Sequence, residues 1–211
     1  MTTPAASPSE RSERRRREVC LAARTVIVRQ GLEATTLRDI AREGGFTTGV
    51  VSHYFPDKTA VIVGTFTFAA EEWNILVQRT VTAAPTAEHC LVNLVRVSIP
   101  TDPVFRSEWR LWSEMWTYAE RDHAFAEQLV DSDAAWERFV RDALVRASEA
   151  GLIRADLDID TEAAVFARLV DGLGLRSSLS GRWTAARRQL VHHMATLGVS
   201  ETLLAQMLED S

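Results

Sequence analysis

The chain has 211 residues, of which 46% are hydrophobic and 25% are charged, and these ordinary values exclude a chain that is disordered throughout. The net charge of −5 excludes a protein that coats nucleic acid along its whole surface. The charge is uneven, however, because residues 1–60 carry ten Arg or Lys against seven Asp or Glu, whereas residues 61–211 carry 14 against 22. A cationic end joined to an acidic body suits local contact with a polyanion.

The N-terminal stretch MTTPAASPSERSERRRR contains no apolar segment, and charges interrupt the later apolar runs before they reach the ~20 residues of a membrane-spanning helix. We therefore expect a cytoplasmic protein without membrane contact. Residues 1–12 are rich in Pro, Ser, Thr and Ala, and this composition predicts a disordered tail. Cys20 and Cys90 are far apart and are expected to be small buried thiols.

From residue 13 onward the sequence predicts helices, because apolar residues recur at spacings of three and four and no stretch alternates long enough for a strand. The expected fold class is therefore all-α. The first helix should end at Gly31 in a left-handed cap, and Thr36 with Asp39 resembles the capping box of a short second helix. A third short helix should run from Thr47 or Thr48 to about Tyr54.

A long fourth helix is expected from Pro56 and Asp57 to about Thr80. Pro and Gly residues then separate further expected helices over residues 85–99, 105–120, 122–150, 161–179 and 184–197, with a last turn or two after Ser200. We predict three parts: the tail 1–12, a helix-turn-helix domain over 13–59, and a helical ligand-binding and dimerisation domain over 60–211.

Residues 36–58, TLRDIAREGGFTTGVVSHYFPDK, have the spacing of a helix-turn-helix. Two helices that cross closely need a small residue on the first, which Ala41 supplies, and a positive φ in the turn, which Gly45 adopts without a Cβ penalty. Four apolar residues then fall where they can close a small core: Ile40, Phe46, Val51 and Tyr54.

With those residues turned inward, the third helix presents a short and almost uncharged polar face, which suits the major groove of DNA. Thr36 and Arg38 can hold one strand, and Lys58, the only lysine, lies near the other. The predicted DNA-binding residues are Thr36, Arg38, Thr47, Thr48, Gly49, Ser52, His53, Tyr54 and Lys58. The alternative is a polar face without a partner on a small helical bundle. Residues 14–17 are all Arg. They belong either to a solvated tail or to a segment that reaches an adjacent minor groove, and the sequence does not decide between these alternatives.

Residues 14–60 resemble the N-terminal domain of TetR-family repressors, and SHYFPDK at 52–58 resembles the subgroup of the choline-responsive regulator BetI. A weaker likeness continues through the rest of the chain, most visibly in LVDGLGLRSSLSG at 169–181. Ser52 departs from the tyrosine that is commoner at this position. The resemblance implies a ligand cavity and a dimer interface in the second half.

Trp109, Trp112 and Trp116 lie at i, i+3 and i+7, so they share one helix face, and Phe105 extends this stripe. Beside Glu108 and Glu114, a row of indoles can bind an organic cation or a hydrophobic compound. The alternative is ordinary core packing. The predicted ligand-binding residues are Phe66, Trp73, Phe105, Trp109, Trp112, Trp116 and Asp171, the last of which needs a partner at the cavity or at the interface.

Gly172 and Gly174 lie inside the expected helix 161–179, where each costs ~1 kcal/mol, so a close packing neighbour is expected. With helix 184–197, this helix could form a four-helix interface across a two-fold axis, the alternative being one intramolecular bundle. No metal-ligand spacing or cofactor motif is evident, so neither a metal nor a cofactor is expected. The sequence therefore predicts a homodimeric repressor that a small molecule releases from a palindromic operator. The alternative is an all-helical small-molecule enzyme or carrier.

Overall fold

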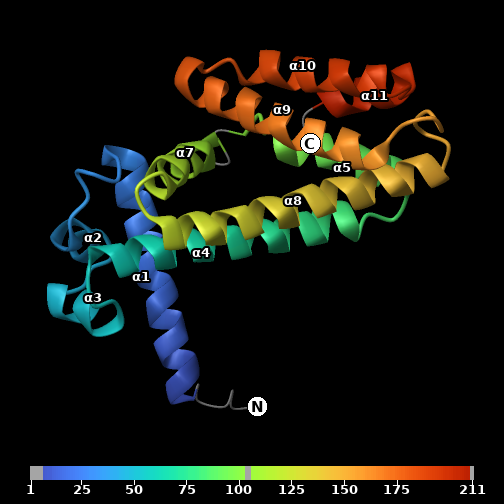
Figure 1. Ribbon diagram of the computed structural model, residues 1–211. Coiled ribbons are helices and arrows are strands. Elements are labelled where there is room, and N and C mark those ends of the chain that lie inside the picture. The colour runs from blue at the N-terminus through green and yellow to red at the C-terminus, as the bar shows by residue number, and fades with distance from the viewer. Residues whose placement is uncertain (1–6, 103–105, 210–211) are drawn as a thin grey trace. The chain divides into compact units, whose positions relative to one another are not determined.

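The computed structural model describes residues 7–102 and 106–209, and within these ranges the chain forms helices and no strand, as predicted (Figure 1). The chain divides into two compact units between Glu71 and Glu72. This division falls inside a helix, fourteen residues beyond its first residue Lys58, whereas the predicted domain boundary at residues 59 and 60 lies at the start of the same helix.

The N-terminal unit contains α1 (Pro8–Gln30), α2 (Leu37–Glu43), α3 (Thr48–Tyr54) and the first part of α4 (Lys58–Val77). Residues 8–12 are helical, so the predicted tail was wrong for them, and residues 1–6 lie outside the described ranges. The physical reason is a capping box in which the Ser7 hydroxyl accepts from the Glu10 amide and the Glu10 carboxylate accepts from the Ser7 amide. Pro8 at the first helical position adds a preset φ.

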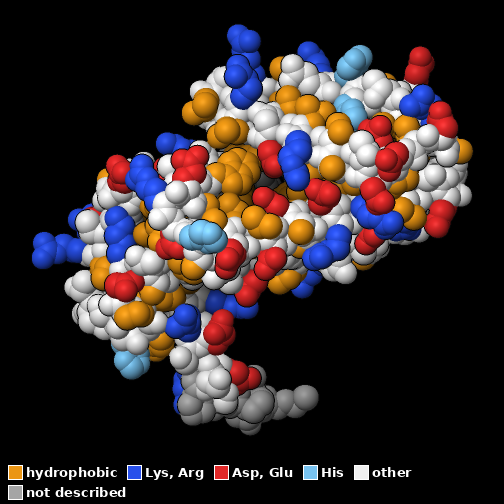
Figure 2. All heavy atoms as spheres, viewed as in Figure 1, with side chains coloured by type: hydrophobic (Ala, Val, Ile, Leu, Met, Phe, Trp, Pro, Cys, Tyr) orange, Lys and Arg blue, Asp and Glu red, His pale blue; other side chains and the backbone are white. Residues whose placement is uncertain are grey.

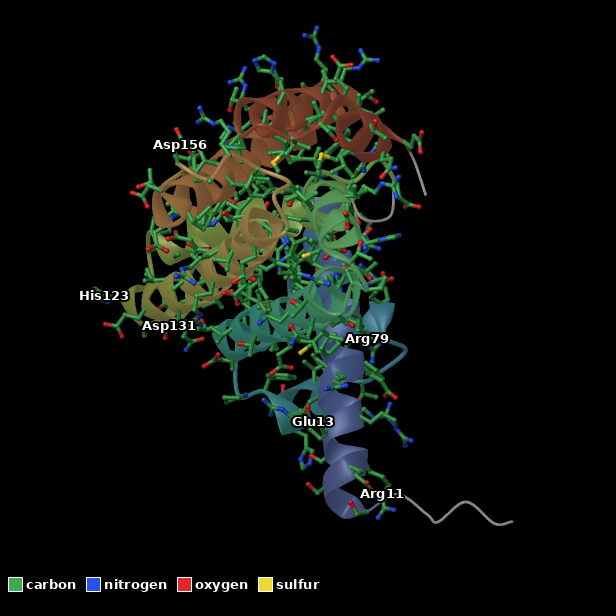
Figure 3. All side chains as sticks on the ribbon, turned by 90° about the vertical axis from the view of Figure 1, so that its right-hand side faces the viewer. Arg11, Glu13, Arg79, His123, Asp131 and Asp156 are labelled. Carbon is green, nitrogen blue, oxygen red and sulfur yellow. The ribbon has the colours of Figure 1, made fainter. Side chains whose placement is uncertain are left out.

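The core of the N-terminal unit joins the second half of α1 to α2, α3 and α4. α1 reaches this core from Val19 onward, and the turns before it extend past α2 and α3, where Figure 3 labels Arg11 and Glu13. The chain leaves α1 at Gly31, whose φ of +82° is positive as predicted, although its ψ of 160° is extended rather than left-handed helical. Fully or nearly buried side chains form the centre: Val19, Ala23, Ile40, Val51, Phe55 and Val61.

The C-terminal unit follows from the end of α4 and holds the longer helices. Their bounds are η1 (Gln78–Thr82), α5 (Ala87–Ser98), α7 (Glu108–Ala119), α8 (His123–Glu149), α9 (Ile159–Ser180), α10 (Trp183–Thr196) and α11 (Glu201–Leu208). In Figure 1, α8 and α9 run along each other, and α10 packs against both α9 and α11. Their apolar faces share one core, which also includes α5 and η1.

The fourth helix does not continue as a regular α-helix to Thr80, because η1 is one π-helical turn. Such turns are rare in proteins, and those that occur are often found at functional sites. Together α4 and η1 form a 25-residue stretch, Lys58–Thr82, that is long and apolar enough to cross a membrane by length and composition alone, contrary to the expectation that charges interrupt every such run. Core helices meet the same test, and this helix contributes Val61 to the N-terminal core and Val77 to the C-terminal core.

Candidate DNA-binding surface and ligand cavity

The turn between α2 and α3 has the geometry that a helix-turn-helix requires. Gly45 has a φ of +67°, and the amide of Phe46 donates to the carbonyl of Ala41 over 2.7 Å. Ala41 is buried where the helices cross, and a Cβ added to Gly44 would overlap the Phe46 ring. The small residue and the positive φ predicted from the spacing are therefore both present.

The polar face of α3 is open to solvent. Thr47 is the N-cap residue, and its hydroxyl accepts from the amide of Val50 over 3.3 Å. Val51 is fully buried and Tyr54 is half-buried against the core, so they turn the opposite face outward. The exposed residues of that face are Thr47, Thr48, Gly49, Ser52 and His53.

The predicted phosphate-binding residues flank this face. The hydroxyl and the amide of Thr36 both donate to the carboxylate of Asp39, over 2.6 Å and 3.3 Å, and the hydroxyl bond lowers the pKa of that carboxyl. Thr36 therefore acts first as the cap of α2. Lys58 donates to the carbonyl of Glu33 over 3.1 Å, which leaves two of its three ammonium protons for another acceptor. Arg38 is exposed.

The arginine run at 14–17 lies on an exposed part of α1 rather than in a tail, and its contact with a minor groove stays a prediction. Part of its charge is offset along the helix, because Arg15 pairs with Glu18 over 2.7 Å. Three guanidinium groups also lie over aromatic rings of the N-terminal unit: Arg15 over Phe46 at 5.2 Å, Arg16 over Phe55 at 4.5 Å, and Arg17 over Phe68 at 5.5 Å. Such contacts join α1 to the elements that carry the polar face.

The C-terminal unit contains a cavity of about 740 Å³, which is within the range that holds drug-sized ligands. The end of α4, η1, α5, α7, α8, α9 and α10 all contribute to its wall. In the space-filling view of Figure 2, hydrophobic side chains gather between α7, α8 and α9, and acidic side chains lie at the margin.

Indole rings dominate one part of the cavity wall. Trp109, Trp112 and Trp116 all line it, as their spacing on one helix face predicted. The ring centres of Trp109 and Trp116 are 6.3 Å apart. Trp73 from α4 and Trp136 from α8 complete the set, with ring centres 5.7 Å apart and an edge-to-face arrangement. Five of the six tryptophans in the chain therefore line one cavity.

Of the other predicted ligand-binding residues, one lines the cavity, one does not, and one is not described. Asp171 lines the cavity, as does Glu108, whereas Glu114 does not. Phe66 was wrongly placed at this space, because it lies two helical turns before Trp73, in the N-terminal unit, where its side chain is fully buried. Phe105 lies outside the described residues.

Two carboxyl groups from different helices, those of Asp133 and Asp171, line the cavity together with the tryptophans. The pKa of Asp171 is raised to about 6, mainly by burial and also by the nearby Asp133 carboxylate, while Arg168 acts in the opposite direction. Burial also raises the pKa of Asp133 on α8, although one side of this residue remains open to solvent. A positively charged group between these carboxyls would favour their ionised forms.

Sequence reasoning missed Trp136, Asp133 and three arginines that also line the cavity: Arg79, Arg96 and Arg187. Trp136 and Asp133 are one turn apart on α8, so they share one helix face. Once one of them is known to line the cavity, this spacing predicts that the other does too. The arginines carry no such signal. Arg187 is 4% exposed and donates to the carbonyls of Ile99 over 2.9 Å and Arg96 over 3.3 Å, contacts that only the folded chain brings together.

Two family models match the chain. The model for the C-terminal domain of BetI-type transcriptional repressors covers residues 87–198, which is more than half of the chain, and the model for bacterial regulatory proteins of the tetR family covers residues 21–63. The second range includes the whole helix-turn-helix, and the first includes most of the helices that line the cavity.

Individual relatives are similar over most of their length. The HTH-type transcriptional regulator PksA of Bacillus subtilis is 22% identical over 90% of this chain and 93% of its own. BetI of Burkholderia ambifaria is 29% identical over 80% of this chain and 84% of its own. A transcriptional regulator from Saccharomonospora viridis, solved in complex with choline, has a TM-score of 0.78 at 24% identity and covers 87% of this chain and 96% of its own. At that identity, the structural likeness establishes the fold.

Proposed function

The chain belongs to the TetR family of bacterial regulatory proteins and has a BetI-type C-terminal domain, and from this premise we propose a homodimeric repressor that leaves a palindromic operator when an organic cation fills its cavity. Like its relatives, it is a ligand-responsive DNA-binding regulator of transcription and not an enzyme. We place it in the cytoplasm, where it reaches chromosomal DNA. The observation that carries the ligand class is the wall of five tryptophans beside Asp133 and Asp171.

The polar face of α3 lies in the major groove in this proposal, where Thr47, Thr48 and Ser52 read base edges and methyl groups together with Gly49 and His53. Around this face, Arg38 and Lys58 bind phosphates of the DNA. Thr36 at the start of α2 and Tyr54 at the end of α3 hold these helix ends beside the DNA backbone. The exposure of all five face residues supports this assignment. Because two heads related by a two-fold axis read two half-sites, the operator is palindromic with half-site centres ~34 Å apart.

Ring faces and carboxylates together define the ligand. An ammonium or alkylammonium group is attracted to indole faces, and the attraction is stronger where water is excluded. Trp109, Trp112 and Trp116 supply such faces on one helix, and Asp171 supplies a negative charge. The choline in the related Saccharomonospora viridis structure supports a quaternary ammonium as the cationic group.

α4 is the covalent link through which occupancy reaches the DNA-binding unit. It begins at Lys58, next to the proposed phosphate contacts, and two residues after the division between the units it brings Trp73 to the cavity wall. The ligand would stabilise a conformer in which the heads no longer match the operator spacing. Because a ligand shifts this equilibrium only by its difference in affinity for the two conformers, tight binding alone does not cause release.

The exposed stripe of α9 is the proposed dimer interface. Val165, Gly172 and Leu179 are seven residues apart, so they share one face, and all three are exposed in the single chain, Leu179 at 83%. Among the residues that the structure describes, none outside the adjoining backbone of α9 comes within 4 Å of a Cβ built on Gly172, which leaves room for a second helix to approach. Such a self-complementary face suits a two-fold contact, to which α10 would contribute from the same side of the bundle.

Two measurements test these assignments. Isothermal titration with choline and tetramethylammonium should show binding to the wild-type protein and a loss of at least tenfold in Trp112→Ala, because one cation–π contact in a desolvated site contributes about 2 kcal/mol. Light scattering should show a dimer that Leu179→Arg converts to a monomer, whereas Ile75→Arg, at another exposed apolar residue, leaves it dimeric. A monomeric wild type, or cation binding unchanged by Trp112→Ala, would contradict the proposal.

A further inference from the structure

The cavity contains a basic wall that a simple cation does not need. Arg79 from η1, Arg96 from α5 and Arg187 from α10 all line the same space as the tryptophans. A guanidinium group is a partner for an oxyanion, which a ligand whose only charge is positive would leave unused. Two further carboxyl groups line the cavity, those of Asp102 and Glu108, and both already have partners within the protein.

Arg79 is the arginine with the most freedom to contact a ligand. It makes no hydrogen bond or ion pair with any residue in the ranges 7–102 and 106–209 that the structure describes, and its side chain is exposed. It belongs to the π-helical turn that follows α4, and Figure 3 labels it there. Arg79 and Thr80 lie three and four residues after Leu76, so the three side chains share one face, and all three line the cavity.

The elements around Arg79 are held in fixed positions. The Asn93 side-chain amide donates to the carbonyl of Thr80 over 2.7 Å, which ties α5 to η1. Arg96 donates to the carbonyl of Gln206 over 2.8 Å, and its own carbonyl accepts from Arg187. The backbone around Arg79 is therefore held in place, so binding an oxyanion orders only the Arg79 side chain. Guanidinium groups match the arrangement of carboxylate and phosphate oxygens.

The carboxyl groups beside the tryptophans lie on other elements. Asp133 is on α8 and Asp171 is on α9, whereas the arginines come from η1, α5 and α10. The cavity lining therefore contains both basic groups and acidic, aromatic groups, and they come from different elements. Its volume of about 740 Å³ is larger than a trimethylammonium group fills, so a ligand has room for a second charged group.

We propose that the effector is a small zwitterion, whose ammonium group lies between the tryptophans and Asp171 and whose oxyanion, a carboxylate or a phosphate, binds Arg79. This inference rests on the proposed function, because it takes this cavity as the effector site. It goes beyond that function by assigning a second charge to the ligand and a specificity-determining role to Arg79.

The test compares probes that share one trimethylammonium group. Isothermal titration of the full-length protein would use tetramethylammonium, choline, glycine betaine, carnitine and phosphocholine. At least one of the last three should bind about tenfold more tightly than choline, because it adds a charge-assisted hydrogen bond to Arg79. Glycine betaine and carnitine are carboxylates that differ in the distance between their two charges, and phosphocholine is a phosphate ester. Comparing the three affinities therefore shows whether the site prefers a carboxylate or a phosphate.

Arg79→Gln should remove the advantage of the zwitterion and leave choline affinity within about twofold. The matched control is Arg110→Gln, which removes an exposed arginine of α7 that does not line the cavity and should leave all five affinities unchanged. Equal losses for choline and zwitterion in Arg79→Gln, or zwitterions that bind no tighter than choline, would overturn this inference and leave the cation assignment in place. Failure of all five probes would overturn both.

Discussion

Gly174 of α9 lies directly against the indole ring of Trp109 of α7, and a Cβ atom added at Gly174 would overlap the ring. The sequence predicted a close neighbour for this glycine, and the neighbour is a cavity tryptophan of the same chain. Both residues are buried, and Trp109 lines the cavity. The missing side chain at this position of α9 thus leaves the space that one indole of the proposed ligand site occupies.

Gly174→Ala should therefore destabilise the protein, although alanine favours a helix. An added methyl group in a packed core costs about 1–3 kcal/mol, which exceeds the ~1 kcal/mol gained in helix propensity. Urea unfolding would measure the loss. The double variant with Trp109→Phe provides the control, because a smaller ring makes room for the methyl group, and the two changes should be less destabilising together than their sum. Additive losses would show that the contact does not limit this site.

Arg16 is predicted to position α3 rather than to bind DNA. Its guanidinium group donates to the carbonyl of Tyr54 over 2.8 Å, at the C-terminal end of α3, and lies over the Phe55 ring. Arg16→Ala should destabilise the N-terminal unit by about 1 kcal/mol and weaken operator binding several-fold. The slope of log affinity against log salt should stay the same, because no phosphate contact is lost.

Arg14→Ala is the matched control, since it removes the same charge from α1 and its ion pair with Glu18 is long, at 3.8 Å. It should leave stability and affinity nearly unchanged. A salt slope reduced by about one in Arg16→Ala would instead show that Arg16 binds a phosphate directly.

The two classes of DNA contact should respond differently to mutation. Arg38→Ala and Lys58→Ala should weaken binding to all sequences and flatten the salt dependence, because both remove a phosphate contact. Thr48→Ala and His53→Ala should instead relax the choice of bases at about 1–3 kcal/mol per lost contact. Fluorescence anisotropy with the operator and a scrambled duplex at several salt concentrations measures both effects. Unchanged affinity and selectivity in all four variants would refute the contact face.

Cation binding should depend on pH through Asp171. The pKa of its carboxyl is about 6 in the folded protein, above the ordinary value of 3.8. At a pH between these two values, the folded protein therefore keeps a proton on Asp171 that the unfolded chain has released. The stability of the ligand-free protein should therefore fall as pH rises from about 4 to 6. A cation prefers the ionised carboxylate, so choline affinity should rise about tenfold between pH 5 and pH 7.

Asp171→Asn should remove this rise, whereas Asp131→Asn should keep it. Asp131 is an exposed carboxylate of α8 that does not line the cavity and is labelled in Figure 3. Isothermal titration in buffers of different ionisation enthalpy would also detect the proton released on binding near pH 6. A pH-independent affinity in the wild type would contradict the role of Asp171 as a counter-ion.

The local parts of the fold and the site could be predicted from the sequence. The helix-turn-helix follows from the spacing of Ala41 and Gly45, and the indole row follows from the spacing of Trp109 and Trp112, because both depend on one or two neighbouring helices. The capping box at Ser7 and Glu10 was also visible in the sequence, yet the composition of the first residues outweighed it. A local signal with a defined hydrogen-bond geometry should have taken precedence.

The remaining parts depend on long-range packing. Arg79 and Arg187 reach the cavity from elements that are more than 100 residues apart in sequence, and no periodic pattern connects them. The π-helical turn at Gln78–Thr82 has no sequence signature, so the end of the regular fourth helix at Val77 could not be predicted. Phe66 was misassigned for the related reason that helix periodicity gives the face of a residue but not the place where a cavity ends.

The most direct test of the account is an electrophoretic mobility shift on the DNA upstream of the chain's own gene, with and without the cavity ligand. The wild-type protein should bind one palindromic site as a dimer and release it when choline or a trimethylammonium zwitterion is added. Trp112→Ala should bind the same site with unchanged affinity and fail to release it. Release of Trp112→Ala at the wild-type ligand concentration would contradict the account, because occupancy of the tryptophan-lined cavity would not be the signal that the DNA-binding unit receives.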